Sequence, residues 1–102
     1  MTPTQRSLKH LRDQGYTVAV VEHWNPFAKI RQDLFGFIDL LALKDGITLA
    51  VQTTSYSNMS ARIRKIAEHE NLRIVRDAGW LIHVHGWRKV GNRWQVNERD
   101  VS

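Results

Sequence analysis

One aspartate interrupts the most apolar segment of this sequence. Asp39 lies within Leu34–Leu43, where most other positions hold Phe, Ile, Leu or Ala. Burying an ionised carboxylate without a partner is costly, so the fold must supply a cation, hydrogen bonds or a metal ion. Taken alone, Asp39 is equally compatible with two roles, a structural ion pair with an arginine and a metal ligand.

The next apolar segment holds two polar residues that favour the interpretation of Asp39 as a metal ligand. Ala50, Gln52 and Thr54 share one face of the strand predicted over Ile47–Thr54, because side chains alternate along a strand. A hairpin register that sets Gln52 and Thr54 beside Asp39 gathers a carboxylate, an amide oxygen and a hydroxyl. Because Mg²⁺ and Mn²⁺ accept such hard oxygen ligands, we expect Asp39 and Gln52 to hold the ion.

Cationic side chains follow on the helix predicted over Asn58–Glu70. Arg62, Lys65 and His69 lie along one flank of its apolar stripe, close to the edge of the core. We expect them to reach over the end of the strand and hold a phosphate group. A row of this kind also serves as a solvated basic surface, and that alternative stays open.

Basic and aromatic residues also meet in the last predicted hairpin. Arg88, Lys89 and Arg93 lie close in sequence to Trp87 and Trp94, which makes the hairpin a surface for contacts with a nucleic-acid backbone. The tryptophans of the chain either stack on unpaired bases or pack inside the fold. The five histidines show no spacing typical of a zinc site.

Composition narrows the possible partners and compartments. Fifteen Lys and Arg against ten Asp and Glu give a formal charge of +5, which favours a polyanion such as nucleic acid, although many small proteins are basic without binding one. The absence of cysteine excludes disulfides and thiolate metal sites. No signal peptide and no membrane-spanning run is evident, so we expect a soluble, cytoplasmic protein without a membrane partner.

The length of 102 residues fits one domain, residues 1–102, with alternating helices and strands. Thr2 and Gln5 form a capping box for the first helix, and Lys44-Asp45-Gly46 makes a tight turn between two strands. The predicted elements are a helix from Pro3 to about residue 14, a strand at Tyr16–Val21, a loop at Glu22–Gln32, a central strand at Leu34–Leu43, a strand at Ile47–Thr54, helices at Asn58–Glu70 and Asn71–Ala78, and strands at Trp80–Trp87 and Arg93–Glu98. This order predicts an α/β fold, with a central mixed sheet flanked by helices.

The order of elements resembles the core of the PD-(D/E)XK nuclease superfamily, in particular its small Holliday junction resolvase-like members. The resemblance covers most of the chain and rests on Asp39 in RQDLFGFIDLLAL, a turn, the polar run Gln52-Thr53-Thr54 and a following helix. By resemblance, Asp39 matches the metal-binding aspartate, Gln52 the acidic residue of the Glu-x-Lys motif, and Thr54 its lysine.

The resemblance implies a restriction-endonuclease-like αβββαβ core and a Mg²⁺- or Mn²⁺-dependent endonuclease that hydrolyses DNA, rather than RNA, with a preference for structured or branched substrates. Threonine in place of the motif lysine departs from the family, so Lys65 first, or Arg62, is expected to supply the missing cation near the phosphate. A homodimer would place two sites on two strands, and such a short basic chain suits a phage or mobile-element product. The alternative is a catalytically inactive nucleic-acid-binding or assembly module.

Two further residues are left outside the expected catalytic set. Asp33 lies six residues before Asp39 in a segment that can fold back over the site, where it is either a second acid or, as we favour, a loop aspartate. Gln5 is explained by the capping box.

Overall fold

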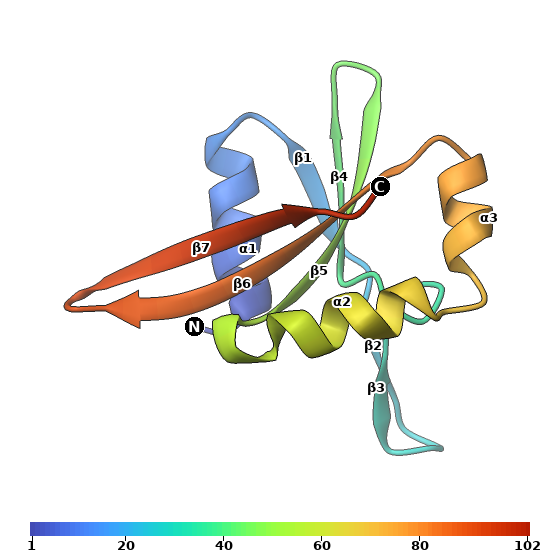
Figure 1. Cartoon of the computed structure of the whole chain (residues 1–102), viewed down its shortest axis with the longest axis horizontal. Helices are drawn as coiled ribbons and strands as arrows, with labels where there is room; N and C mark the ends of the chain where they lie inside the picture. Colours follow the sequence, from blue (N-terminus) through green and yellow to red (C-terminus); the bar gives the residue numbers. More distant parts are fainter.

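The chain folds around a five-stranded mixed sheet with strand order β1-β4-β5-β6-β7 (Figure 1). The computed structural model describes all residues, 1–102. Strands β5 and β6 run parallel, and every other neighbouring pair is antiparallel. The strands of this sheet are β1 (Thr17–Val20), β4 (Leu40–Lys44), β5 (Ile47–Ser55), β6 (Leu81–Val90) and β7 (Arg93–Asp100).

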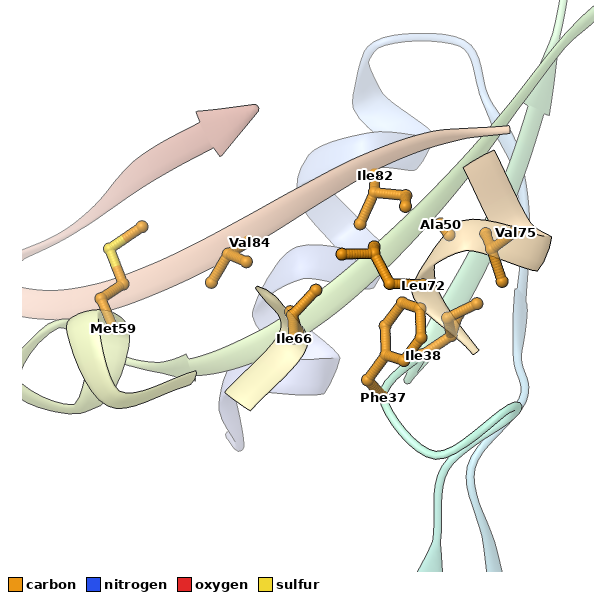
Figure 2. Close-up of a cluster of buried hydrophobic side chains, with 9 residues drawn as sticks. All are labelled: Phe37, Ile38, Ala50, Met59, Ile66, Leu72, Val75, Ile82 and Val84. Carbon is orange, nitrogen blue, oxygen red and sulfur yellow. The ribbon is translucent and has the colours of Figure 1, made fainter. Parts of the chain in front are cut away.

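Helices cover both faces of the sheet. Helix α1 (Pro3–Asp13) packs on one face, where Leu11 meets the side chains of Leu49 and Val51. The short 3₁₀ helix η1 (Tyr56–Asn58), α2 (Met59–Ala67) and α3 (Leu72–Asp77) lie on the other face. The hydrophobic core between these helices and the sheet is drawn in Figure 2. It consists of Phe37, Ile38, Ala50, Met59, Ile66, Leu72, Val75, Ile82 and Val84. None of these helices has the length and apolar character needed to cross a membrane.

Several local expectations are confirmed. Thr2 and Gln5 form the capping box, with Gln5 N donating to Thr2 Oγ1 over 3.2 Å and Thr2 N donating to Gln5 Oε1 over 3.1 Å. Asp45 and Gly46 both adopt positive φ, 50° and 79°, as the tight hairpin turn between β4 and β5 requires. The α/β class, the helix at the expected place of α2 and the final hairpin are also confirmed.

The prediction of one continuous strand over Leu34–Leu43 is wrong. Leu34 forms a single β-bridge to Ile38, and residues between them make a turn, so that β4 begins only at Leu40. Gly36 is the physical reason, because its φ of 90° is a conformation that side-chain-bearing residues rarely adopt. Asp39 therefore lies immediately before β4.

The prediction of an unstructured loop at Glu22–Gln32 is also wrong. This segment contains a second, two-stranded sheet of β2 (His23–Asn25) and β3 (Ile30–Gln32), which projects from the main body (Figure 1). Asn25 and Pro26 begin the turn between these two strands. Asn25 Oδ1 accepts hydrogen bonds from the backbone nitrogens of Phe27 and Ala28.

Candidate functional site

A polar pocket opens where the carboxyl end of β5 meets the first turns of α1 and α2. Its volume is about 480 Å³, and none of its lining residues is hydrophobic. The first residues of α1 and the start of α2 contribute to its wall through Pro3, Thr4, Asn58 and Arg62. The lining residues are Pro3, Thr4, Glu22, Arg31, Asp33, Asp39, Thr53, Thr54, Ser55, Asn58 and Arg62.

Three carboxylates meet at this pocket. Oxygen atoms of Glu22, Asp33 and Asp39 lie within 4.8 Å of one another. Glu22 immediately precedes β2 and Asp33 immediately follows β3, so closure of that hairpin brings the two together. Asp39 enters from the start of β4, where its backbone nitrogen donates to Val51 O over 2.9 Å.

Protein donors hold Asp39 through one of its two carboxylate oxygens. Asp39 Oδ2 accepts from Gln52 Nε2 over 2.6 Å, from Thr53 N over 2.7 Å and from Thr53 Oγ1 over 3.2 Å. Thr53 Oγ1 in turn lies 2.7 Å from Thr4 Oγ1, which ties the site to α1. These bonds all end on Oδ2, and Oδ1 accepts from none of these three donors.

The surroundings of Asp39 make its ionisation unfavourable. Burial, together with a hydrogen bond to Asp33 and the negative charges of Asp33 and Glu22, raises the pKa of Asp39 from 3.8 to about 8, although the Thr53 backbone N–H opposes the shift. At neutral pH the carboxyl therefore keeps its proton. A divalent cation would remove the same repulsion, so this donor set of hard carboxylate oxygens fits Mg²⁺ or Mn²⁺.

Two arginines complete the charge distribution of the pocket. Arg31 on β3 places Nη1 3.5 Å from Glu22 Oε1, and Arg62 reaches the pocket from α2. Lys65, expected to act first, is exposed and does not line the pocket. His69 also lies elsewhere, because it packs against the turn at Gly36 and its Nδ1 accepts from the Asn71 backbone nitrogen over 3.1 Å.

The two β5 residues singled out from the sequence have different positions. Gln52 lies beside Asp39 and is buried, but it does not line the pocket, and its amide nitrogen serves as the donor to Asp39. Gln52 therefore orients Asp39 through this hydrogen bond. Thr54 is buried and lines the pocket, whereas no lysine does.

The basic residues of the final hairpin lie apart from this pocket. Arg88 stacks its guanidinium over Tyr56, 4.5 Å from the ring centroid. Lys89 and Arg93 are exposed near the turn of the β6–β7 hairpin, and none of the three lines the pocket.

Sequence reasoning missed two charged residues of the pocket, Glu22 and Arg31, and undervalued a third, Asp33. Glu22 and Arg31 were given no role at the site, and Asp33 was favoured as a loop aspartate, whereas the structure brings it against Asp39. A usable signal was present, because Asn-Pro between two short runs can be a hairpin turn. Recognising it would have paired the two ends of the segment and placed Glu22 near Asp33.

A second polar cluster lies beneath α1, away from the pocket. Trp87 Nε1 donates to Ser7 Oγ over 2.8 Å, and Ser7 Oγ shares a second hydrogen bond with His85 Nδ1, 2.9 Å away. His85 Nε2 lies 3.2 Å from Glu98 Oε1 without forming a hydrogen bond to it. Burial lowers the pKa of His85 from 6.5 to about 4. This cluster holds α1 to β6.

The pocket has the chemical means to bind a divalent cation and a phosphate together. Three carboxylates meet in its wall, and Arg31 and Arg62 supply positive charge there. No model of a known protein family matches the sequence, and no curated protein matches it either. The pocket geometry is thus the feature from which a function can be argued.

Proposed function

We propose that this protein is a metal-dependent nuclease that hydrolyses phosphodiester bonds in DNA. One observation carries the proposal: buried Asp39 meets Glu22 and Asp33 in a polar pocket that Arg62 also lines. A carboxylate whose pKa is raised by burial and by neighbouring acids has no evident structural purpose, whereas it is suited to a divalent cation.

The fold supports the same proposal. The element order α1, β1, β4, β5, α2, β6 corresponds to the αβββαβ order of the restriction-endonuclease-like core, with an antiparallel first part and a parallel β5–β6 pair. The β2–β3 hairpin is then an insertion between the first two strands of that core. In that scheme the acidic pocket lies at the carboxyl end of β5, on the strand that carries Gln52-Thr53-Thr54.

Each side chain has a distinct part in the proposed reaction. When bound, a divalent cation supplies Lewis acidity toward a phosphoryl oxygen and activates water. Gln52 and Thr53 hold the orientation of Asp39, so that the ion is bound in one place. Arg62 offsets the negative charge that develops on the phosphoryl oxygens, as a permanently charged donor. Arg62 cannot act as a general base, because its guanidinium stays protonated.

Binding specificity would be for the backbone or for DNA structure. No helix stands free of the sheet to enter a major groove, since α1 and α2 each bury one side against it. The formal charge of +5 supports contacts to phosphates, which carry no base sequence information.

A second candidate function is a nucleic-acid-binding module that has lost catalysis. Its support is specific, because Thr54 stands where the related motif has lysine and no lysine lines the pocket. In this case Asp39 and its partners would be the remnant of an active site.

The decisive experiment measures cleavage of labelled linear, single-stranded and branched DNA with Mg²⁺, Mn²⁺ or EDTA. We expect cutting that needs the metal ion and disappears in Asp39→Asn. Arg62→Ala and Lys65→Ala form a matched pair on one helix, and only the first removes a residue of the pocket. We expect Arg62→Ala to lower the cleavage rate about 100-fold or more, the usual effect of losing one donor that stabilises charge in the transition state. Lys65→Ala should leave the cleavage rate unchanged.

The outcomes separate the two candidate functions. Salt-dependent DNA binding without any cutting would contradict the nuclease and favour the inactive module. Equal losses in Arg62→Ala and Lys65→Ala would assign both residues to DNA binding rather than to the reaction.

A further inference from the structure

The β2–β3 hairpin carries an aromatic side chain that the fold leaves uncovered. Phe27 is 97% exposed at the tip, and Trp24 and Ile30 on the two strands are 56% and 50% exposed. The strands pair only with each other, and Figure 1 shows the hairpin pointing away from the main sheet and its helices. Phenylalanine is among the residues most often buried, so packing within the chain does not explain Phe27.

The turn holds Phe27 in a defined place. Asn25 Oδ1 accepts from the backbone nitrogens of Phe27 over 3.0 Å and Ala28 over 3.1 Å. Pro26 restricts its own φ, and Lys29 closes the turn with a φ of 54°. A hydrogen-bonded tip loses less conformational entropy when it meets a partner than a loose loop would, which favours a binding role.

The charge of the hairpin indicates the chemistry of that partner. Residues 23–32 include Lys29 and Arg31 and contain no Asp or Glu. Trp24 lies directly across from Arg31 in the hairpin register, so the two side chains belong to the same face of the hairpin. Aromatic rings beside cations suit unpaired nucleobases and their phosphates, since every base offers a π-face.

The base of the hairpin is also a wall of the acidic pocket. Glu22, Arg31 and Asp33 all line the pocket, and they lie at or beside the ends of β2 and β3. Three strand residues at about 3.4 Å each put the tip roughly 10 Å beyond the pocket. That reach is roughly three base steps of a nucleic-acid strand, so a strand bound at the pocket is within reach of Phe27.

We infer that the β2–β3 hairpin binds unpaired nucleobases, with Phe27 stacking on a base close to the phosphate in the pocket and Lys29 contacting the backbone. The inference rests on the proposed function for the position of the substrate, but stacking itself does not need catalysis. It predicts preference for single-stranded, gapped or branched DNA over a continuous duplex, because an intact stack offers no free base face.

The test measures binding of the full chain to single-stranded and duplex DNA by fluorescence anisotropy, with Ca²⁺ present and at one fixed salt concentration. An oligonucleotide containing 2-aminopurine reports stacking through quenching of its fluorescence. Phe27→Leu keeps an apolar side chain without a ring, and Phe27→Tyr keeps the ring. Ile74→Ala on α3, where Ile74 is 68% exposed, controls for loss of an exposed apolar side chain elsewhere.

We expect Phe27→Leu to raise the Kd for single-stranded DNA by roughly 5- to 150-fold, the range that corresponds to losing one stacked base. Quenching of 2-aminopurine should disappear in the same variant and survive in Phe27→Tyr. The Kd for duplex DNA should not change, and Ile74→Ala should match wild type in every assay.

The failures of this inference and of the nuclease proposal are distinguishable. If wild type cuts DNA while Phe27→Leu binds and quenches as wild type does, the hairpin inference is overturned and the nuclease stands. If wild type binds and quenches through Phe27 but never cuts, the hairpin inference holds and catalysis fails. If sedimentation shows that Phe27→Leu only converts a dimer into monomers, the tip contacts a second copy of the chain and the inference is overturned.

Discussion

Gln52 Nε2 donates a hydrogen bond of 2.6 Å to Asp39 Oδ2, and both side chains are buried. The hairpin register explains the contact, because Leu40 pairs with Val51 and the next step places Asp39 opposite Gln52. A donor at this position favours the ionised form of Asp39 and fixes its orientation. A glutamate there would instead add one more carboxylate to an already acidic site.

Gln52→Leu should therefore weaken both the fold and the metal site. The variant leaves Asp39 without one donor, and we expect a loss of about 1–3 kcal/mol in unfolding free energy, measured by urea denaturation. Isothermal titration with Mn²⁺ should show weaker binding, because the carboxylate is less well oriented. Gln95→Leu on exposed β7 is the matched control and should change neither quantity. Unchanged Mn²⁺ affinity in Gln52→Leu would contradict the orienting role.

The stability of the metal-free protein should depend on pH through two buried groups with opposite slopes. Between pH 3.8 and about 8, folded Asp39 holds a proton that the unfolded chain lacks, so stability falls as pH rises. Between about pH 4 and 6.5, the unfolded chain holds a proton that folded His85 lacks, so stability rises with pH. The two slopes nearly cancel up to pH 6.5.

We therefore expect the unfolding free energy of wild type to be nearly constant from about pH 4 to 6.5. From pH 6.5 to about pH 8 it should decrease, because only the Asp39 slope remains. Urea unfolding of Asp39→Asn should instead show stability that rises up to pH 6.5 and then levels off, with a slope of at most about 1.4 kcal/mol per pH unit for one proton. Identical pH profiles of the two proteins would show that Asp39 titrates normally.

Mn²⁺ binding should depend on the carboxylates of the pocket and on pH. Asp33→Asn and Glu22→Gln each remove one charge beside Asp39, and we expect Kd to rise by roughly tenfold or more, at least the size seen when an outer ligand is lost. Affinity should increase up to about pH 8, because Asp39 must release its proton to bind the ion. Asp77→Asn on exposed α3 should bind as wild type does. Equal affinities in all four proteins would exclude a metal site here.

Ser7→Ala should destabilise the fold without affecting the metal site. The variant leaves Trp87 Nε1–H without its acceptor and His85 Nδ1 without its hydrogen-bond partner, at a cost of about 2 kcal/mol in unfolding free energy. Tryptophan fluorescence should follow the same unfolding transition and shift in the native state. Ser60→Ala, at an exposed position on α2, provides the comparison and should cost little. Wild-type stability in Ser7→Ala would mean that water replaces the hydroxyl.

Local signals predicted the elements that depend on local physics. The capping box starts α1 because Thr2 and Gln5 satisfy backbone groups within one turn, and Asp45-Gly46 makes a hairpin because both adopt positive φ. The strand containing Asp39 was overextended because apolar composition does not reveal a backbone reversal. Gly36 makes that reversal possible, and the packing of His69 against it leaves no room for a side chain.

The sequence by itself determined the α/β order of elements, the basic charge and the burial of Asp39, because these follow from composition and from contacts between near neighbours. Only the tertiary structure decided which charged side chains join Asp39 and Gln52 at the pocket. Glu22 and Asp33 join it because a hairpin closes between them. Arg62 rather than Lys65 faces the pocket because burial of Met59 and Ile66 sets the rotation of α2 on the sheet.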